Sequence, residues 1–301
     1  MSNYHTTALV VSFDDNYIPY AKFLLSSLNK YAPKEIEFFL LTPIETEIEE
    51  LELSIILGER KSSHIPIDYH GLNKDLPVLG HFTLSMYGRL FIPELLPKRI
   101  KQSLYLDIDV LVRGSLNELF ELPLVKPIAA VAAKSACDHL SLPIDASSTF
   151  FSGLLLINHS EWRSNQILSR CLDIINSDKE VLTYPDNDLL IIVCNTPIKR
   201  NWTEISPKYN YMSYWENEKS YKIQSPLIIH FPGSDKPWNS PFGGKYARQW
   251  RKEFRNLYPD FRLPIKVYFD YFYRRSISLL YRTLVFPSTR WIRKLQSAKP
   301  K

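Results

Sequence analysis

Two aspartates, Asp107 and Asp109, interrupt an otherwise apolar stretch that runs from Ser103 to Val112. In an extended strand, residues two apart project from the same face, so we expect the two carboxylates to lie together. Burying two like charges is costly unless a cation neutralises them, and Mg²⁺ and Mn²⁺ prefer such hard oxygen ligands. The alternative is that the strand ends at the aspartates and leaves them in a solvated loop. The apolar residues on both sides favour a buried metal site.

A second acidic cluster, Asp186-Asn187-Asp188, precedes an apolar helix predicted over residues 189–194. Aspartates at a helix start are also common as simple N-caps, because their carboxylates accept hydrogen bonds from the first backbone N–H groups. Both a binding role and a capping role are therefore open for these residues.

His230 lies in a strand predicted over residues 228–231, and Gly233 and Lys236 follow it. A lone histidine at the end of a strand is often structural. A glycine and a lysine three and six residues later are also typical of a loop that faces a phosphate.

Arg89 lies near the start of a helix predicted over residues 85–96. There it can bind a phosphate or pair with one of the aspartates that follow, and a surface arginine is the alternative. Gly153 lies inside an apolar strand predicted over residues 150–158, where a glycine indicates close approach by a ligand or by a neighbouring chain segment.

Strands and helices alternate in the first seventy residues. Apolar runs and 3.6-residue periodicity predict strands at 8–13, 36–41, 64–67 and later 127–133, and helices at 19–31, 44–57 and later 162–176. This order predicts an α/β fold with a mixed, mostly parallel sheet and a nucleotide at the carboxyl ends of its strands. Neither GxGxxG nor GxxxxGK[ST] occurs, so dinucleotide and P-loop sites are not expected.

The composition suits a folded protein of 301 residues, since 45% of the residues are hydrophobic. The three cysteines are widely spaced and form no CxxC, so neither a disulfide framework nor a zinc site is expected. The first residues do not resemble a signal peptide, and no apolar run approaches the roughly 18 residues of a membrane span. We therefore expect a cytoplasmic protein.

The positive charge is concentrated in residues 266–301, which hold nine Lys or Arg residues and one acidic residue, within a net charge of +5 for the chain. Basic and aromatic residues alternate there, which is typical of a segment in an anionic membrane interface. Nucleic-acid binding, which we do not expect, and a helix docked on the body are the alternatives. The sequence thus predicts a body over residues 1–265 and a membrane-associating tail over residues 266–301.

Six segments, in order over residues 8–240, resemble the motifs of family 8 glycosyltransferases, which are retaining, metal-dependent enzymes with a GT-A fold. The segments are Asp14-Asp15-Asn16-Tyr17, His81 to Leu90, Leu104 to Leu111, Phe150 to Asn158, Asp186-Asn187-Asp188 and His230 to Trp238. The likeness is greatest to bacterial galactosyl- and glucosyltransferases of lipooligosaccharide synthesis. The resemblance implies transfer of galactose or glucose from a UDP-sugar to a glycan or lipid-linked glycan at the inner face of the membrane.

The resemblance also implies roles for individual residues. Asp107, Asp109 and His230 would bind the metal, and this donor set favours Mn²⁺, with Mg²⁺ also possible. Asp188 would hold hydroxyls of the donor sugar. Asn187 would lie beneath its anomeric carbon, where a weakly nucleophilic amide favours front-face attack over a covalent intermediate. The other implied donor-binding residues are Asp14, Asp15, Asn16, His81, Arg89, Ile108, Ser152, Asp186, Gly233 and Lys236.

Two positions depart from the family pattern and leave the donor hexose open. Lys134 stands where the family usually has an acidic residue, and Phe151 stands where it usually has asparagine. Asp138 can restore the missing carboxylate if the loop is shifted.

Two other functions share part of the pattern. A phosphatase of the haloacid-dehalogenase type also places DxD after an apolar strand, but Leu111 stands where that class has Thr or Val, and its later GDxxxD is missing. A non-catalytic sugar-nucleotide-binding protein would require loss of the metal ligands, which are all present.

Overall fold

The computed structural model describes residues 6–48, 50–72, 76, 83–133, 148–177, 182–196, 199–217, 223–241, 244–269 and 273. The chain divides into two compact units, residues 1–234 and 235–301. The predicted boundary at residue 266 stays a prediction, because most of the segment 266–301 lies outside the described residues.

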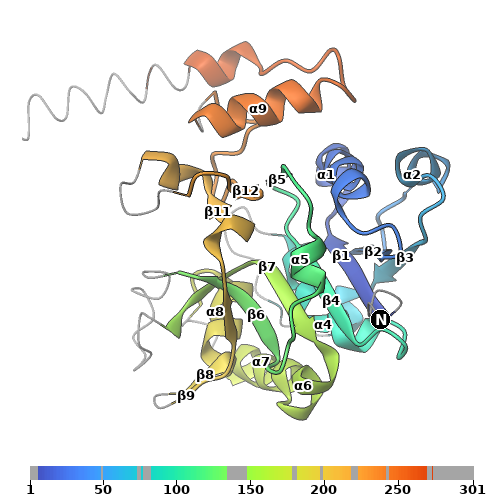
Figure 1. Ribbon diagram of the computed structural model, residues 1–301, viewed down its shortest axis with the longest axis vertical. Helices are drawn as coiled ribbons and strands as arrows, with labels where there is room; N and C mark the ends of the chain where they lie inside the picture. The colour runs from blue at the N-terminus through green and yellow to red at the C-terminus, as the bar shows by residue number, and fades with distance from the viewer. Residues whose placement is uncertain are drawn as a thin grey trace, which may run out of the picture. The chain divides into compact units, whose positions relative to one another are not determined.

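A mixed seven-stranded sheet forms the centre of the first unit (Figure 1). In spatial order its strands are β10 (Thr203–Ile205), β6 (Ile128–Ala132), β7 (Phe150–Asn158), β4 (Gln102–Leu106), β1 (Thr7–Ser12), β2 (Glu37–Pro43) and β3 (Ser62–Ile67). Strands β4, β1, β2 and β3 run parallel, as do β10 and β6, while β7 is antiparallel to β4 and β6. The predicted mixed, mostly parallel sheet is confirmed.

Two smaller sheets accompany the large one. They consist of β11 (Tyr211–Met212), β12 (Ile228–His230) and β5 (Val110–Val112), and of β8 (Asn195–Thr196) and β9 (Lys199–Arg200).

The helices are α1 (Ile18–Tyr31), α2 (Glu50–Leu57), α3 (Tyr69–Leu72), α4 (Gly88–Leu95), α5 (Asn117–Phe120), α6 (His159–Ser164), α7 (Ile167–Ser177), α8 (Pro185–Cys194) and α9 (Gly244–Phe254). Short 3₁₀ turns are η2 (Asp15–Tyr17), η3 (Leu84–Tyr87), η6 (Pro207–Tyr209) and η7 (Ser213–Asn217). Helices α1 and α2 lie side by side (Figure 1).

The sheet is covered on both faces. Successive side chains of β1 point to opposite faces, and all six are buried. On one face, side chains of the strands join α4, α6, α7 and α8 in one continuous apolar core. This burial explains why the strands have continuous apolar sequences instead of alternating ones.

The prediction of one strand through both aspartates is wrong. Strand β4 ends at Leu106 in the large sheet, and β5 begins at Val110 in the three-stranded sheet. Residues 107–109 connect the two sheets, so a bend in the chain, and not strand pleating, brings the carboxylates together. The apolar pattern could not indicate this break, because both strands are buried.

Several predicted helices differ at their ends. The helix predicted over 44–57 begins at Glu50, and the one predicted over 162–176 consists of α6 and α7. Between α6 and α7, Gln166 has a φ of 53°, which interrupts helical geometry. Helix α8 begins at Pro185, four residues earlier than predicted, so the acidic cluster lies in its first turn.

The second unit contains α9. The rings of Trp250 and Phe254 stack with centroids 4.6 Å apart, and the buried Arg251 donates to the carbonyl oxygens of Pro237 and Ser240. Within the part of the chain that the structure describes, no helix is both long enough and apolar enough to span a bilayer.

Candidate active site

The end of β4 and the start of β5 bring both aspartates beside a histidine that is distant in sequence. The N–H of Asp107 donates to the carbonyl oxygen of Gly153 in β7 over 2.9 Å. On the other side, β12 pairs with β5, and the N–H of Phe231 donates to the carbonyl oxygen of Asp109 over 2.9 Å. The main chain therefore places His230 next to the two aspartates.

Asp107, Asp109 and His230 form a compact cluster, which we call the metal cluster. Nε2 of His230 lies 3.2 Å from Oδ1 of Asp109 and 3.8 Å from Oδ2 of Asp107. One ligand atom from each residue lies within 4.8 Å of the other two. Nδ1 of His230 lies 3.0 Å from Oδ1 of Asn210, and because an amide oxygen only accepts, Nδ1 donates there.

The chemistry of the metal cluster fits a divalent cation. Both ring nitrogens of His230 face oxygen atoms, so the ring is satisfied either by two protons or by one proton and a cation shared with the carboxylates. Two carboxylates and one imidazole are a donor set suited to Mn²⁺ and related ions.

The absence of a side chain at Gly153 makes room for the side chains of the metal cluster. A Cβ at this position would overlap the ring of His230 and would lie 2.8 Å from Oδ2 of Asp107. The close approach predicted for Gly153 is confirmed, and the groups that approach it are the side chains of the cluster.

Arg89 is a buried cation between the two acidic clusters. Its guanidinium lies 2.6 Å from Oδ1 of Asp107 and 2.9 Å from Oδ2 of Asp186, and it donates to Ser152 O and Oγ over 2.9 Å each. The hydroxyl of Tyr105 also donates to Oδ1 of Asp107, over 2.7 Å. Burial favours a lower pKa for Arg89, but the charges of the two aspartates outweigh it and raise its pKa above the ordinary value. Arg89 therefore stays charged and pairs with aspartates, as one of its predicted roles required.

The first turn of α8 is tied to β7. Oγ of Ser152 donates to Oδ2 of Asp186 over 3.1 Å, and the N–H of Ser152 donates to Oδ1 of Asn187 over 2.8 Å. Arg89 and Ser152 thus link this turn to the metal cluster through hydrogen bonds. The predicted place of Asn187 beneath an anomeric carbon stays a prediction.

Asp188 is fully buried in α8, and its carboxylate bonds to the backbone just before the helix. Its Oδ2 accepts from the N–H groups of Thr183 and Tyr184, each over 2.8 Å. Neither N–H lies within α8, so these bonds join the helix to the chain before it and are not those of an N-cap. The predicted contact with donor hydroxyls stays a prediction.

The loop after β1 lies near the metal cluster. Oδ1 of Asp14 accepts from the N–H of Asn16 over 3.0 Å, and Oδ2 accepts from Oγ of Ser85 over 3.5 Å. Asp15 and Asn16 are exposed. Burial first, and then the charges of Asp14 and Asp109, raise the pKa of Tyr17. The carboxylate of Asp109 is therefore within electrostatic reach of this loop.

For the other predicted site residues, the structure gives fewer contacts or none. Ile108 is half-buried between the two aspartates. Gly233 has a φ of 76°, a left-handed conformation that favours glycine, and Lys236 lies in the second unit. Three further residues lie outside the described residues: His81, Lys134 and Asp138.

Phe151, where the family usually has asparagine, makes an aromatic contact. It is half-buried on β7 next to Ser152, and its ring lies edge-on to that of Trp215 with centroids 5.9 Å apart.

Two residues that contact the metal cluster, Asn210 and Tyr105, were not predicted from the sequence. Asn210 lies in the aromatic segment 201–225, which has no clear periodicity, and its contact with His230 spans 20 residues. Tyr105 appeared to be one more apolar residue of a strand. Its spacing of two from Asp107 was the signal that could have indicated a shared face.

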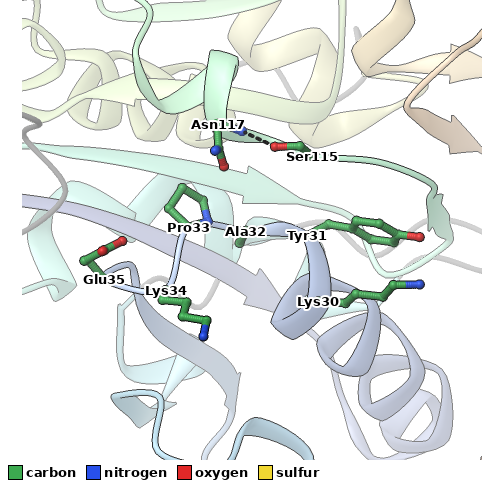
Figure 2. Close-up of a pocket in the computed structure, with 8 residues that line it drawn as sticks. All are labelled: Lys30, Tyr31, Ala32, Pro33, Lys34, Glu35, Ser115 and Asn117. Atoms are coloured by element: carbon green, nitrogen blue, oxygen red, sulfur yellow. Dashed lines mark hydrogen bonds between the residues drawn. The ribbon is translucent and has the colours of Figure 1, made fainter.

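A separate hollow of about 470 Å³ lies at the end of α1 (Figure 2). It is open and polar, and its lining contains none of the predicted site residues. The lining residues are Lys30, Tyr31, Ala32, Pro33, Lys34, Glu35, Ser115 and Asn117.

Comparisons with known proteins agree with this geometry. The model of glycosyl transferase family 8 matches residues 8–241. The chain is 29% identical over 182 residues to general stress protein A of Bacillus subtilis, covering 54% of this chain and 61% of that protein. It is 28% identical over 198 residues to lipopolysaccharide 1,2-glucosyltransferase of Escherichia coli strain K12, covering 60% of this chain and 57% of that protein. The chain thus matches less than two thirds of the length of either relative.

A solved structure has the same fold. The galactosyltransferase LgtC, solved with donor and acceptor sugar analogues, superimposes with a TM-score of 0.69 at 22% identity, over 86% of this chain and 98% of that one. The family match covers every described residue of the metal cluster and of the first turn of α8. The chain therefore belongs to glycosyl transferase family 8 and has a GT-A-like fold.

Proposed function

We propose that the protein transfers a hexose, galactose or glucose, from a UDP-hexose to a glycan or lipid-linked glycan acceptor. The observation that carries this proposal is the cluster of Asp107, Asp109 and His230 at the carboxyl end of the sheet. In α/β sheets of this type, ligands bind outside the carboxyl ends of the strands. The names of relatives, among them lipopolysaccharide 1,2-glucosyltransferase and lipopolysaccharide 1,3-galactosyltransferase, support the class of donor and acceptor.

In this proposal Asp107, Asp109 and His230 hold Mn²⁺, or Mg²⁺ in its place. The ion would neutralise charge on the diphosphate and so make UDP a better leaving group. Arg89 holds Asp107 in position through its 2.6 Å ion pair, and Gly153 leaves room for the side chains of His230 and Asp107. Lys236 and Gly233 are proposed to face the same diphosphate.

The donor would lie between the loop after β1 and the first turn of α8. Asp15 and Asn16 are exposed after β1 and are proposed, with Asp14, to bind uracil and ribose. His81, Ile108, Ser152 and Asp186 are proposed to line the rest of the donor site. Asn187 and Asp188 would support the sugar.

The transfer step is proposed to occur on the face from which UDP leaves. The bond between the anomeric carbon and the diphosphate oxygen breaks, a bond to the acceptor oxygen forms, and the acceptor proton passes to the diphosphate. The amide of Asn187 is too weak a nucleophile for a covalent intermediate, and its oxygen accepts a hydrogen bond from Ser152. An α-linked donor should therefore give an α-linked product. A β-linked product, identified by NMR coupling constants, would contradict this step.

A screen of UDP-sugars tests the function without knowledge of the acceptor. Full-length protein is incubated with Mn²⁺ and single UDP-sugars, and released UDP is measured. We expect slow hydrolysis of UDP-galactose or UDP-glucose that stops when EDTA is added. Release of phosphate from simple phosphomonoesters without release of UDP would contradict the proposal and favour a phosphatase.

We also propose that residues 266–301 hold the enzyme at an anionic membrane surface on the cytoplasmic side. The support is the sequence, with nine basic residues among aromatic ones, each worth about 1 kcal/mol near such a surface. Deletion of this segment should release the protein from anionic liposomes and leave donor hydrolysis nearly unchanged. A control that replaces only the basic residues with glutamine should also release it. Sedimentation of the truncated protein with liposomes at low salt would contradict the proposal.

A further inference from the structure

Asn210 makes a contact with the metal cluster that differs from those of the ligands. It is fully buried, and its Oδ1 lies 3.0 Å from Nδ1 of His230. The nitrogen of the same amide, Nδ2, is also buried and has no hydrogen-bond partner among the described residues. Among the described residues, the amide of Asn210 therefore makes a hydrogen bond through its oxygen, and its partner is His230.

The position of Asn210 is fixed by its surroundings. It lies between η6 and β11, and β11 pairs with β12, the strand that carries His230. Before it, the carbonyl oxygen of Lys208 accepts from the N–H of Leu227 over 2.7 Å, and the hydroxyl of Tyr209 donates to Oε2 of Glu118 over 2.5 Å. The backbone on both sides of Asn210 is therefore held in place by hydrogen bonds, and this fixes the position of its amide.

Leaving an amide N–H₂ group buried without a partner costs about 1–3 kcal/mol, so such a group calls for an explanation. An apolar residue of similar size would remove that cost but would also remove the acceptor at Nδ1. A neutral imidazole has one N–H, and the acceptor beside Nδ1 places that hydrogen there. Nε2 is then left with its lone pair directed at the space between Asp107 and Asp109.

We propose that Asn210 is a positioning residue that selects the Nδ1–H tautomer of His230 and so makes Nε2 available as a metal ligand. The inference rests on the proposed metal site. It assigns Asn210 no contact with donor or acceptor. Outer residues of this kind orient a ligating histidine and raise its basicity, and their loss typically weakens metal binding by about 10–100-fold.

Three variants of the full-length protein test this role. Asn210→Leu removes the acceptor at similar size, and Asn210→Asp keeps an acceptor oxygen at the position while it replaces the unused N–H₂ group with a second oxygen and adds a negative charge. Asn195→Leu is the matched control, because Asn195 is also buried and, among the described residues, its amide donates to the carbonyl oxygen of Ile191 in α8 and not to the metal cluster. Mn²⁺ affinity is measured by calorimetry without donor, and the tautomer of His230 by long-range ¹H–¹⁵N NMR of the metal-free protein.

We expect Asn210→Leu to weaken Mn²⁺ binding about 10–100-fold and to shift His230 toward the Nε2–H tautomer. Asn210→Asp should restore both the affinity and the Nδ1–H signature, and Asn195→Leu should leave both unchanged. The proposal is overturned if Asn210→Leu keeps the Nδ1–H tautomer, or if Asn210→Asp and Asn210→Leu lose affinity equally. Failure of the wild type to bind Mn²⁺ would overturn the metal site itself, whereas the NMR result would still decide the role of Asn210.

Discussion

A histidine lies beside each end of β4: His159, from α6, beside its start, and His230, from β12, beside its end. The groups around the two rings differ in charge. At the start of β4, His159 is buried, its Nε2 lies 3.0 Å from Oγ of Ser103, and its charged neighbours are Arg163 and Lys101. At its end, His230 faces two carboxylates. The cations beside His159 disfavour a bound metal ion, whereas the carboxylates beside His230 favour one.

The comparison shows that a histidine near a strand end carries no function by its type alone. Burial first, then Arg163, lowers the pKa of His159 to about 4, so this ring is neutral and structural near pH 7. His230 has oxygen atoms at both nitrogens and a glycine that leaves space beside it. The charge of the neighbours therefore separates a packing histidine from a candidate ligand.

The largest effect on stability is expected from removing Arg89, the buried cation beside the end of β4 that faces His230. Arg89→Met leaves Asp107 and Asp186 without their buried partner and should lower the free energy of unfolding by about 3–5 kcal/mol. Urea denaturation measures this loss. The control is Arg99→Met, because Arg99 pairs with Glu37 at the surface and should cost less than about 1 kcal/mol. Equal losses for the two variants would show that Arg89 is not essential for charge balance.

His159, beside the start of β4, should make the free energy of unfolding depend on pH. The folded pKa of His159 is about 4 and the unfolded value about 6.5, so between these values the unfolded state binds more protons. Stability should fall as the pH drops from 6.5 to 4, by on the order of 3 kcal/mol from this residue. His159→Gln should remove that part of the slope in denaturation curves at several pH values. Parallel pH profiles for the wild type and the variant would contradict a buried, neutral His159.

Removing either carboxylate of the metal cluster should abolish metal-dependent turnover while the fold survives. Asp107→Ala and Asp109→Ala should each lower UDP-sugar hydrolysis on the order of 10²-fold. Asp109→Ala is the cleaner test, because Asp107 also accepts from Arg89 and Tyr105. Asp173→Ala, on the exposed face of α7, is the control. Retention of more than about a tenth of the wild-type rate in either variant would argue against the metal site.

The sequence predicted those parts of the molecule that depend on local pattern. The strand predicted over residues 150–158 coincides with β7, because a long apolar run between polar segments has few other solutions. Asp107, Asp109 and His230 were predicted from their residue types and from the family resemblance, and the structure brings them together.

The features that depend on distant pairing could not be predicted in this way. Nothing local indicates that β5 leaves the sheet of β4 to pair with β12, more than 110 residues later. The same holds for the bond of Asn210 to His230, and for the position of Arg89 between two carboxylates that follow it in the chain. The bonds of Asp188, in contrast, are local, because they join residues four and five positions apart in the chain.

The most direct test of the account compares the two histidines by Mn²⁺ titration calorimetry on the full-length protein. If the end of β4 that faces His230 is the metal site, His230→Ala should weaken Mn²⁺ binding by roughly 10–100-fold. His159→Gln, at the other end of the same strand, should bind Mn²⁺ within about threefold of the wild type, a difference below 1 kcal/mol. Unchanged Mn²⁺ affinity in His230→Ala, or an equal loss in His159→Gln, would contradict the account.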